Sequence, residues 1–451
     1  MLAEARLLAV AIDSRLDPLE AVRRFGGDTR PFALVGAWAG SGAVVGSEPL
    51  VTLGPNGDPF QTLGQVPVVE GGTGRHVGGG WFGYLGYQLN QRLERLPPPP
   101  PRPLPLPDHS LAFYDHLLRY DARSRRWWFE ALWSPERDGF LRSRLELLTR
   151  RLQDESHRRP YDYRVGAFEA LESEERHVSS VSRCRDHIYA GDIFQANICL
   201  RLGSPFSGRP EDLFARGVTE LRPPLSAFIK DDWGALASFS PELFLQRRGR
   251  QVHTAPIKGT RERDPVPAVA ERQRRALLDS GKDRAENVMI VDLMRNDLGR
   301  VCVPGTVRVP DMLRAEAHPG VWHLVSDVVG ELRAGAGDAG LVRACFPPGS
   351  VTGAPKVRAM EIINELESTG REIYTGAVGF ASPAWGLEFN VAIRTFEIAH
   401  GSVWLGAGGG VVADSDPHAE YLECFVKAEP LIRAVSTGPY RRLHRSGPAG
   451  R

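Results

Sequence analysis

The second half of the chain carries two regular patterns of apolar residues. Between residues 282 and 299, Ile290, Leu293 and Met294 recur at the spacing of a helix face. Between residues 389 and 411, apolar and smaller or polar residues instead alternate along the chain, with a turn at residues 400 and 401. From about residue 174 onward these patterns predict helices and β-hairpins joined by short connections.

Three other segments carry signals for the start of an element. Asp416 is a natural N-cap and Pro417 suits the first helical position, so a helix is predicted after residue 416. Pro355 lies near the start of another helix, after a glycine-rich turn. Residues 78–89 alternate glycines with aromatic side chains, which is typical of a close-packed strand and turn.

A proline-rich segment, residues 96–107, interrupts the N-terminal third. Proline cannot donate a backbone hydrogen bond, so this segment is predicted to be extended polyproline II. We interpret it as a stiff connector, with an SH3 ligand as the alternative. Residues 437–451 are polar, basic and glycine-rich, and are predicted to form a disordered tail.

Composition excludes several classes of function. Lys and Arg number 56 against 55 Asp and Glu, so no excess positive charge favours nucleic acid as a partner. No apolar run approaches the ~20 residues that span a bilayer, and residues 1–18 are too acidic for a signal peptide. The 5 cysteines form no zinc-like pattern and predict reduced thiols in the cytoplasm. A small charged molecule is the expected partner.

Acidic residues gather on two of the predicted helices. Asp283 and Glu286 are three residues apart at one end of an apolar stripe. Glu420, Glu423 and Lys427 share one face of the helix that follows Asp416. Each group alone is compatible with a solvated helix face. Together they favour a shared Mg²⁺, which is typically held by one or two carboxylates and by substrate oxygens.

Other candidate residues lie on strands and turns. Arg394 shares a predicted strand face with apolar residues, so it needs an anion, which is either an internal carboxylate or a substrate carboxylate. The glycines at 406–410 would let backbone N–H groups approach a ligand. His323 lies on a strand-like run, where a structural role is common. Lys258, between Pro256 and Gly259, is held on a shaped turn.

These segments, taken in order, resemble the chorismate-utilising enzymes. The motifs that carry the resemblance, over residues 174 to 435, are "GDIFQANICL", "SPELF", "PIKGT", "DRAENVMIVDLMRND", "HLVSDVVG", "GSVTGAPK", "YTGAVGF", "FNVAIRT" and "GAGGGVVADSDPHAEYLE". The resemblance implies an α+β fold like that of anthranilate synthase component I, with packed antiparallel β-sheets flanked by helices. It also implies an N-terminal region at 1–165, which contains the proline-rich connector, and a chorismate-binding catalytic domain at 170–436.

Two positions distinguish members of the family by their chemistry. Members that add water to chorismate have a lysine base where this chain has Gln195, and an amide cannot deprotonate water. Anthranilate synthases resemble "PIAGT", whereas this chain has Lys258 in "PIKGT". The lysine resembles that of aminodeoxychorismate synthases, where it attacks C2 of chorismate before ammonia enters at C4. The implied product, 4-amino-4-deoxychorismate, leads to 4-aminobenzoate and folate or to a specialised aromatic compound.

The resemblance also assigns the remaining site residues, position by position. Catalytic residues would be Lys258 as nucleophile, Glu242 as general acid and His323 beside the ring. Mg²⁺ would be held by Glu286 and Glu423, with Asp283 and Glu420 in support. Substrate would be bound by Ser350, Tyr374, Arg394, Gly408, Gly409, Gly410 and Lys427. One departure is Asn287, where family members often have histidine.

The resemblance further implies a separate glutamine amidotransferase subunit that supplies ammonia. The chain has no cysteine in a glutaminase-like elbow, so ammonia must come from elsewhere. Two alternatives remain: an anthranilate synthase component I, and a non-catalytic module that binds chorismate. The second alternative is disfavoured because Lys258, Glu242, Glu286, His323 and Glu423 are all present.

Overall fold

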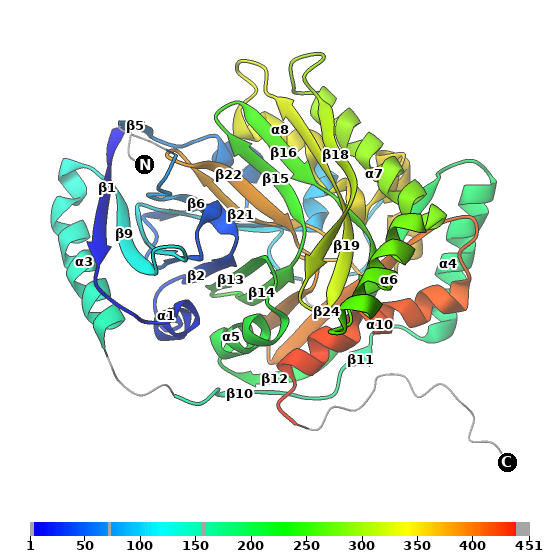
Figure 1. Ribbon diagram of the computed structural model, residues 1–451, viewed down its shortest axis with the longest axis horizontal. Coiled ribbons are helices and arrows are strands. Elements are labelled where there is room, and N and C mark those ends of the chain that lie inside the picture. The colour runs from blue at the N-terminus through cyan, green and yellow to red at the C-terminus, as the bar shows by residue number, and fades with distance from the viewer. Residues whose placement is uncertain (1–3, 71–73, 104, 155–158, 439–451) are drawn as a thin grey trace.

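The computed structural model describes residues 4–70, 74–103, 105–154 and 159–438 (Figure 1). Over these residues the chain forms two large β-sheets, of fourteen and ten strands, with helices packed outside them. Neighbouring strands are antiparallel, except that the first strand pairs with β5 in parallel. The predicted α+β fold with packed antiparallel sheets is confirmed. Most of the predicted tail, residues 439–451, lies outside the described residues.

The larger sheet contains strands from both ends of the chain. In sheet order its strands are β10 (Tyr163–Val165), β12 (Gln195–Gly208), β24 (Ser402–Val411), β23 (Thr395–Ala399), β14 (Gly234–Ser240), β13 (Leu225–Asp231), β2 (Phe32–Gly36), β3 (Ala43–Gly46), β8 (His116–Asp121), β9 (Arg126–Trp133), β1 (Glu4–Ile12) and β5 (Val68–Glu70). Two short strands, β11 (Glu169–Ala170) and β20 (Gly353–Ala354), pair with β12.

The smaller sheet also mixes strands from the two halves. Its strands, in order, are β17 (Ile257–Glu262), β19 (Val321–Glu331), β16 (Gln251–Ala255), β15 (Leu243–Arg248), β22 (Gly386–Val391), β21 (Ala377–Ser382), β6 (Gly80–Leu85), β7 (His109–Tyr114) and β4 (Val51–Thr52). A further strand, β18 (Arg308–His318), pairs with β19. Since strands before and after residue 165 share both sheets, the two predicted regions fold as neighbours in the same layers.

Helices cover the outer faces of the two sheets. The α-helices are α1 (Pro18–Phe25), α2 (Pro59–Leu63), α3 (Asp138–Gln153), α4 (Glu174–Tyr189), α5 (Pro210–Leu221), α6 (Pro267–Asp279), α7 (Gly281–Gly299), α8 (Gly337–Cys345), α9 (Lys356–Leu366) and α10 (Pro417–Val435). Short 3-10 helices are η1 (Trp38–Gly40), η2 (Tyr87–Arg92), η3 (Pro135–Arg137) and η4 (Gly349–Val351). As predicted, Asp416 caps α10 by accepting a hydrogen bond from the Ala419 N–H (2.8 Å).

The hydrophobic core of the described residues has three large clusters, which follow from the arrangement of the sheets, and a smaller one that packs α4 and α9 on β12. A central cluster lies between the sheets and includes Phe32 and Leu236 of one sheet with Phe82 and Phe380 of the other. A second cluster lies between the larger sheet and helices α1, α3, α5 and α10. A third lies between the smaller sheet and helices α2, α7 and α8. The sheets are therefore buried on both faces, which their dense apolar patterns require.

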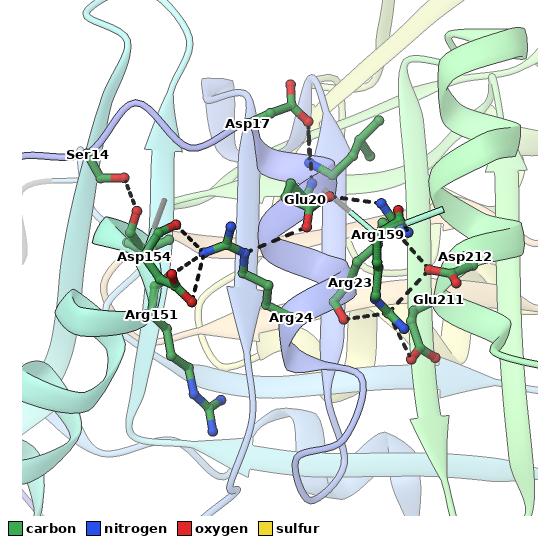
Figure 2. Close-up of polar contacts among 12 residues, drawn as sticks. Ser14, Asp17, Glu20, Arg23, Arg24, Arg151, Asp154, Arg159, Glu211 and Asp212 are labelled. Atoms are coloured by element: carbon green, nitrogen blue, oxygen red, sulfur yellow. Dashed lines mark hydrogen bonds and ion pairs between the residues drawn. The ribbon is translucent and has the colours of Figure 1, made fainter. Parts of the chain in front are cut away.

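An ion-pair network attaches α1 to α5 (Figure 2). Arg23 of α1 contacts Asp212 of α5 (2.7 Å) and Glu20 of its own helix (2.9 Å). Arg159 also approaches Asp212 (3.4 Å). The Arg23, Glu20 and Asp212 side chains are buried, so each of these charges depends on the others for compensation.

The proline-rich segment packs against the second half of the chain. The described residues of 96–107 form neither helix nor strand. The Gly370 N–H donates to the Pro101 carbonyl (2.9 Å), and the Asn364 side chain donates to the Pro97 carbonyl (3.0 Å). Arg102 binds Glu372 through its Nε (2.8 Å). These contacts attach the segment to the protein itself, as expected of a connector.

One local prediction was wrong. The hairpin of β23 and β24 turns at His400 and Gly401 as predicted, but Arg394 lies before β23 rather than within a strand. Its φ is +52°, a left-handed conformation that interrupts the alternation. The guanidinium therefore leaves the apolar face that the period-2 pattern assigned to it, while Phe396 and Ile398 remain buried.

Candidate active site

Lys258 lies in a β-bulge at the start of β17. The register of β17 against β19 shifts between Ile257 and Thr260, so Lys258 and Gly259 fall in the irregular step. Gly259 has a φ of +82°, and a Cβ there would lie 3.0 Å from the side chains of both Asp283 and Leu277. A residue with a side chain would be strained and crowded at this position. The bulge thus fixes the direction of the Lys258 side chain.

The Lys258 amine is surrounded by charged side chains. Burial lowers its pKa, while the negative charges of Glu286 and Glu242 oppose that shift. The charge of Lys427 adds to the lowering, and that of Glu423 opposes it. Lys258 is therefore close to all four of these residues, which come from three different segments of the sequence, since Glu423 and Lys427 both lie on α10.

Glu242 occupies the short link between β14 and β15 and is 3% exposed. The Ile257 N–H donates to its Oε1 (3.4 Å). Burial raises the pKa of Glu242 to about 7, although Ser350, Lys258 and Arg394 all favour the ionised form. A carboxyl group with this pKa can hold a proton near neutral pH and release it, as a general acid must.

His323 lies on β19, one strand away from Lys258. Its Nδ1 is 3.1 Å from the Thr260 hydroxyl, and its Nε2 has no hydrogen-bond partner among the described residues. Burial lowers the pKa of His323 to about 3, and the nearby charges of Arg394 and His318 act in the same direction. The imidazole is therefore neutral at physiological pH.

Arg394 and Ser350 lie beside Glu242. Ser350, in η4, supplies a hydrogen bond that favours the ionised form of Glu242. Burial lowers the pKa of Arg394, with Glu242 as the opposing negative charge. No carboxylate of the described residues lies within 4 Å of the Arg394 guanidinium. Two other buried arginines, Arg201 and Arg371, each have such an ion pair. Of the two anions considered for Arg394, this leaves a ligand carboxylate as the better candidate.

Tyr374 packs against the glycine-rich strand β24. The Tyr374 ring packs directly on Gly406, where a Cβ would collide with it. Gly408, Gly409 and Gly410 pair with β12, but the pairing of β24 with β23 extends only to Leu405. On its other side, the glycine segment thus has no paired strand among the described residues.

Acidic residues of α10 lie beside the glycine segment and close to those of α7. A Cβ on Gly409 would lie 2.8 Å from Glu420 Oε2 and 3.7 Å from Glu423 Oε1, so both carboxylates reach the glycine segment. Lys427 Nζ contacts Glu423 (2.8 Å) and donates to the Gly408 carbonyl (2.8 Å). Burial raises the pKa of Glu286, and the charges of Asp283 and Glu420 contribute to this increase.

This donor set suits a hard divalent cation. Carboxylates that raise one another's pKa gain from a shared positive charge, and oxygen is the ligand that Mg²⁺ prefers. Among the described residues no group of three or more His, Cys, Asp or Glu side chains is arranged to hold a metal alone. Asp283 pairs with Arg261 (2.6 Å).

Two residues near the site, Asn287 and Lys282, make contacts that the sequence did not predict. Asn287 is fully buried, donates to the Leu324 carbonyl (3.2 Å) and accepts from the Ser326 hydroxyl (2.6 Å), so it ties α7 to β19. Lys282, at the start of α7, lies 4.0 Å from Glu286, and its charge also acts on Glu420 and Glu423. Neither role could be read from local sequence, because the partners come from other elements.

Two kinds of comparison place the chain among known proteins. Residues 55–433 match the family model of the chorismate binding enzyme. Aminodeoxychorismate synthase component 1 of Klebsiella aerogenes is 39% identical over 372 residues, which are 80% of this chain and 78% of that protein. Anthranilate synthase component 1 of Streptomyces coelicolor is 36% identical over 448 residues, 94% of this chain and 87% of that protein.

A solved structure agrees with these relatives. The crystal structure of anthranilate synthase component I from Streptococcus pneumoniae TIGR4 has a TM-score of 0.74 and 25% sequence identity. The match covers 95% of this chain and 92% of the other. No helix among the described residues is long and apolar enough to cross a membrane.

Proposed function

Because the chain belongs to the chorismate binding enzyme family, we propose that it converts chorismate and ammonia into 4-amino-4-deoxychorismate. The choice of reaction rests on the surroundings of Lys258. This lysine is fixed in a bulge, burial lowers its pKa, and Glu242 lies beside it. A neutral amine is a nucleophile, and a carboxyl group that is protonated near pH 7 is an acid.

In the first step Lys258 attacks chorismate. The lone pair of Nζ forms a bond to C2, the two ring double bonds each shift by one position, and the bond between C4 and its hydroxyl oxygen breaks. Glu242 donates its proton to the departing oxygen, which leaves as water. The bulge at Gly259 keeps the amine in one orientation for this attack.

In the second step ammonia replaces the lysine. The lone pair of ammonia forms a bond to C4, the double bonds shift back, and the bond between C2 and Nζ breaks, with its electron pair returning to Lys258. Glu242, now ionised, accepts the proton that the new amino group releases. Chorismate and ammonia thus give 4-amino-4-deoxychorismate and water, and the enolpyruvyl ether is retained.

The remaining residues hold the substrate. Glu286 and Glu423 would ligate Mg²⁺, with Asp283 and Glu420 in support, and the bound metal would neutralise the ring carboxylate. Arg394, Tyr374 and the backbone of Gly408, Gly409 and Gly410 would bind the enolpyruvyl carboxylate. Ser350 and Lys427 would contact the substrate near the metal end. The neutral imidazole of His323 would pack beside the ring.

Ammonia would come from a glutamine amidotransferase subunit. The relative from Klebsiella aerogenes is named component 1, which fits an enzyme that works with a second component. The five cysteines of this chain are buried and unpaired, which suits a reducing cytoplasm and gives no exposed thiol for a glutaminase of its own.

The test combines product analysis with loss of the lysine. Purified protein is incubated with chorismate, Mg²⁺ and ammonium at alkaline pH, with and without aminodeoxychorismate lyase. We expect 4-aminobenzoate only with the lyase, and its loss, or diversion to anthranilate, in Lys258→Ala. Formation of isochorismate by the wild type would contradict the proposal. Absence of any turnover by folded protein would instead support a non-catalytic module.

Anthranilate synthesis is the second candidate. It is favoured by the match to the Streptomyces coelicolor anthranilate synthase component 1, which covers more of this chain than the Klebsiella match does (94% against 80%). Anthranilate is fluorescent and forms without a lyase, so the same incubation separates the two reactions. If the wild type produces anthranilate without the lyase, Lys258 does not attack C2 of chorismate as proposed.

A further inference from the structure

A hollow separate from the candidate active site opens beside the last strand of the larger sheet. It has a volume of about 460 Å³, and its lining includes Tyr161, Tyr163, Arg164, Arg216 and Thr437. β10, which contributes Tyr163 and Arg164, lies at the end of the sheet order and pairs with β12 (Figure 1). Pockets that hold small molecules have volumes of about 300–1,000 Å³, so this hollow is large enough for such a ligand.

The ion-pair network of Figure 2 fixes one wall of this hollow. Arg23 lies over the ring of Tyr161, 4.9 Å from the ring centroid, and its Nη2 donates to the Pro160 carbonyl (2.9 Å). Asp212, which pairs with Arg23, accepts a hydrogen bond from the Asp162 N–H (2.8 Å). The backbone on both sides of Tyr161 is therefore anchored to buried charges, and this wall of the hollow is preformed.

The residues that follow α10 form another wall. The Tyr163 hydroxyl donates to the Val435 carbonyl (2.9 Å), and the Val165 N–H donates to the Thr437 hydroxyl (3.4 Å). Burial raises the pKa of Tyr163 to about 12, although the charge of Arg216 and a hydrogen bond from it oppose this increase. Arg216, on α5, therefore lies beside the Tyr163 hydroxyl, and the hollow joins α5 and β10 to the end of α10.

Two guanidinium groups in the hollow lack a carboxylate partner. No carboxylate of the described residues lies within 4 Å of Arg164 or Arg216, whereas the nearby Arg23 and Arg209 each have one. The described lining residues include no acid. An arginine fork binds a carboxylate through two parallel hydrogen bonds, so the hollow is suited to an anion.

The same hollow also offers apolar surface. Tyr161 is 44% exposed although Arg23 holds its ring in place, and Tyr163 and Val165 add further apolar atoms to the lining. Aromatic rings pack favourably on one another in stacked or edge-to-face arrangements. A ligand that matches both parts of the hollow therefore has a carboxylate and a flat ring. A bare anion such as phosphate would leave the ring surface uncovered.

We propose that this hollow binds a small aromatic carboxylate, with Arg216 and Arg164 contacting the carboxylate and Tyr161 packing on the ring. The site does not depend on the proposed function, because none of its lining residues takes part in that reaction. The ligand would contact α5, β10 and the residues after α10 at once. Since these contacts exist only in the folded protein, binding should raise the melting temperature.

The test measures binding to the full-length protein by titration calorimetry and by the shift in melting temperature. The probes are benzoate, 4-aminobenzoate, cyclohexanecarboxylate and inorganic phosphate. We expect the two aromatic carboxylates to bind and to raise the melting temperature. Cyclohexanecarboxylate should bind about two- to tenfold more weakly, the effect of one lost ring contact. Equal binding of phosphate and benzoate would contradict the ligand class, and no binding of any carboxylate at millimolar concentration would contradict the site.

Substitutions locate the bound probe. Arg216→Gln should raise the Kd for benzoate about 10- to 100-fold, the effect of one lost charge-assisted hydrogen bond. Tyr161→Leu should instead remove the preference for benzoate over cyclohexanecarboxylate. The matched control is Arg209→Gln, because Arg209 is an exposed arginine that pairs with Asp162 (4.0 Å) and lies outside the lining. Its Kd should equal that of the wild type. Arg164→Gln repeats the test if Arg216→Gln does not fold.

The candidate active site is the competing location for an aromatic carboxylate, and Arg394→Gln separates the two. Benzoate binding should be unchanged in Arg394→Gln and weakened in Arg216→Gln. The reverse result would place the probe in the active site and overturn the proposal, while the proposed function would stand. Binding is measured without turnover, so a failure of the proposed function would not alter this result.

Discussion

The two ends of the candidate active site differ in how they are built. At the inner end Glu242 is 3% exposed and His323 is 1% exposed, and burial shifts both pKa values toward the neutral forms. At the outer end the side chains of Glu423 and Lys427 are 47% and 46% exposed and form an ion pair. The inner groups are therefore suited to proton transfer and the outer groups to binding charged oxygens.

This difference follows from the elements that supply each end. The inner residues come from β19 and from the link between β14 and β15, in strands that are buried on both faces. The outer residues, Glu423 and Lys427, come from one face of α10, beyond its first turn. Burial makes a charge costly and so raises the pKa of Glu242, whereas the ion pair with Lys427 on the same helix face lowers the pKa of Glu423. Each of the following variants tests one end against the other.

The strongest test of the inner end is Glu242→Gln. The amide keeps the shape of the side chain but cannot donate a proton as an acid, so kcat for 4-amino-4-deoxychorismate should fall about 10²- to 10⁴-fold. A matched control is Glu388→Gln, since Glu388 is also buried and burial also raises its pKa to about 7. Glu388 lies between the sheets near Ala39, away from Lys258. An equal loss in both variants would contradict a catalytic role for Glu242.

The same residue predicts a pH dependence of stability. The folded-state pKa of Glu242 is about 7, above its ordinary value of 4.5. Below that ordinary value the group is protonated in both states and its contribution does not change. As pH rises toward 7 the unfolded state releases the proton first, so this group lowers the free energy of unfolding, by on the order of 3 kcal/mol.

Chemical denaturation of the wild type and Glu242→Gln at pH values of about 4 and 8 measures this effect. The free energy of unfolding of the glutamine variant, relative to wild type, should be higher at the alkaline pH than at the acidic pH. A difference that does not change with pH would mean that Glu242 titrates normally, and the contrast between the two ends would then be wrong.

At the outer end of the site, the corresponding test of metal binding is Glu423→Gln. Loss of one anionic ligand should raise the Mg²⁺ concentration for half-maximal activity about 10- to 100-fold, with a parallel loss in calorimetric Mg²⁺ binding in the presence of chorismate. Asp292→Asn is the control, because Asp292 is a 74% exposed acid of α7 that pairs with Arg295. If both variants behave like the wild type, Glu423 is not a ligand.

The smallest effect on catalysis is expected for Asn287→Ala. Both polar atoms of Asn287 are used inside the protein, in the bonds with Leu324 and Ser326. Its loss should lower the free energy of unfolding by about 1–3 kcal/mol, as measured by denaturation, while kcat changes less than threefold. A large loss of Mg²⁺ binding with unchanged stability would instead assign Asn287 to the metal site.

The start of a helix and the position of a turn could be predicted from local sequence. Asp416 and Pro417 predicted the start of α10, because capping depends on neighbours along the chain. The turn at His400 and Gly401 was predicted from alternation on both sides of it. The candidate residues were found because their motifs resemble a family, and their roles remain predictions.

Other properties depend on residues that are far apart in sequence. The period-2 pattern placed Arg394 on a strand, but its left-handed backbone takes it out of β23, and Glu242 lies nearby. The lowered pKa of Lys258 depends on burial by several elements, and its orientation depends on a bulge that forms only against β19.

The sequence by itself determined which chemical groups are present and which local elements carry them. Only the tertiary structure decided which of these groups are buried, which are charged and which are left without a partner, as the Nε2 of His323 is among the described residues. The physical reason is that helix capping and strand alternation act between near neighbours. Desolvation and electrostatic interactions instead depend on everything within a few ångströms in space, whatever its position in the chain.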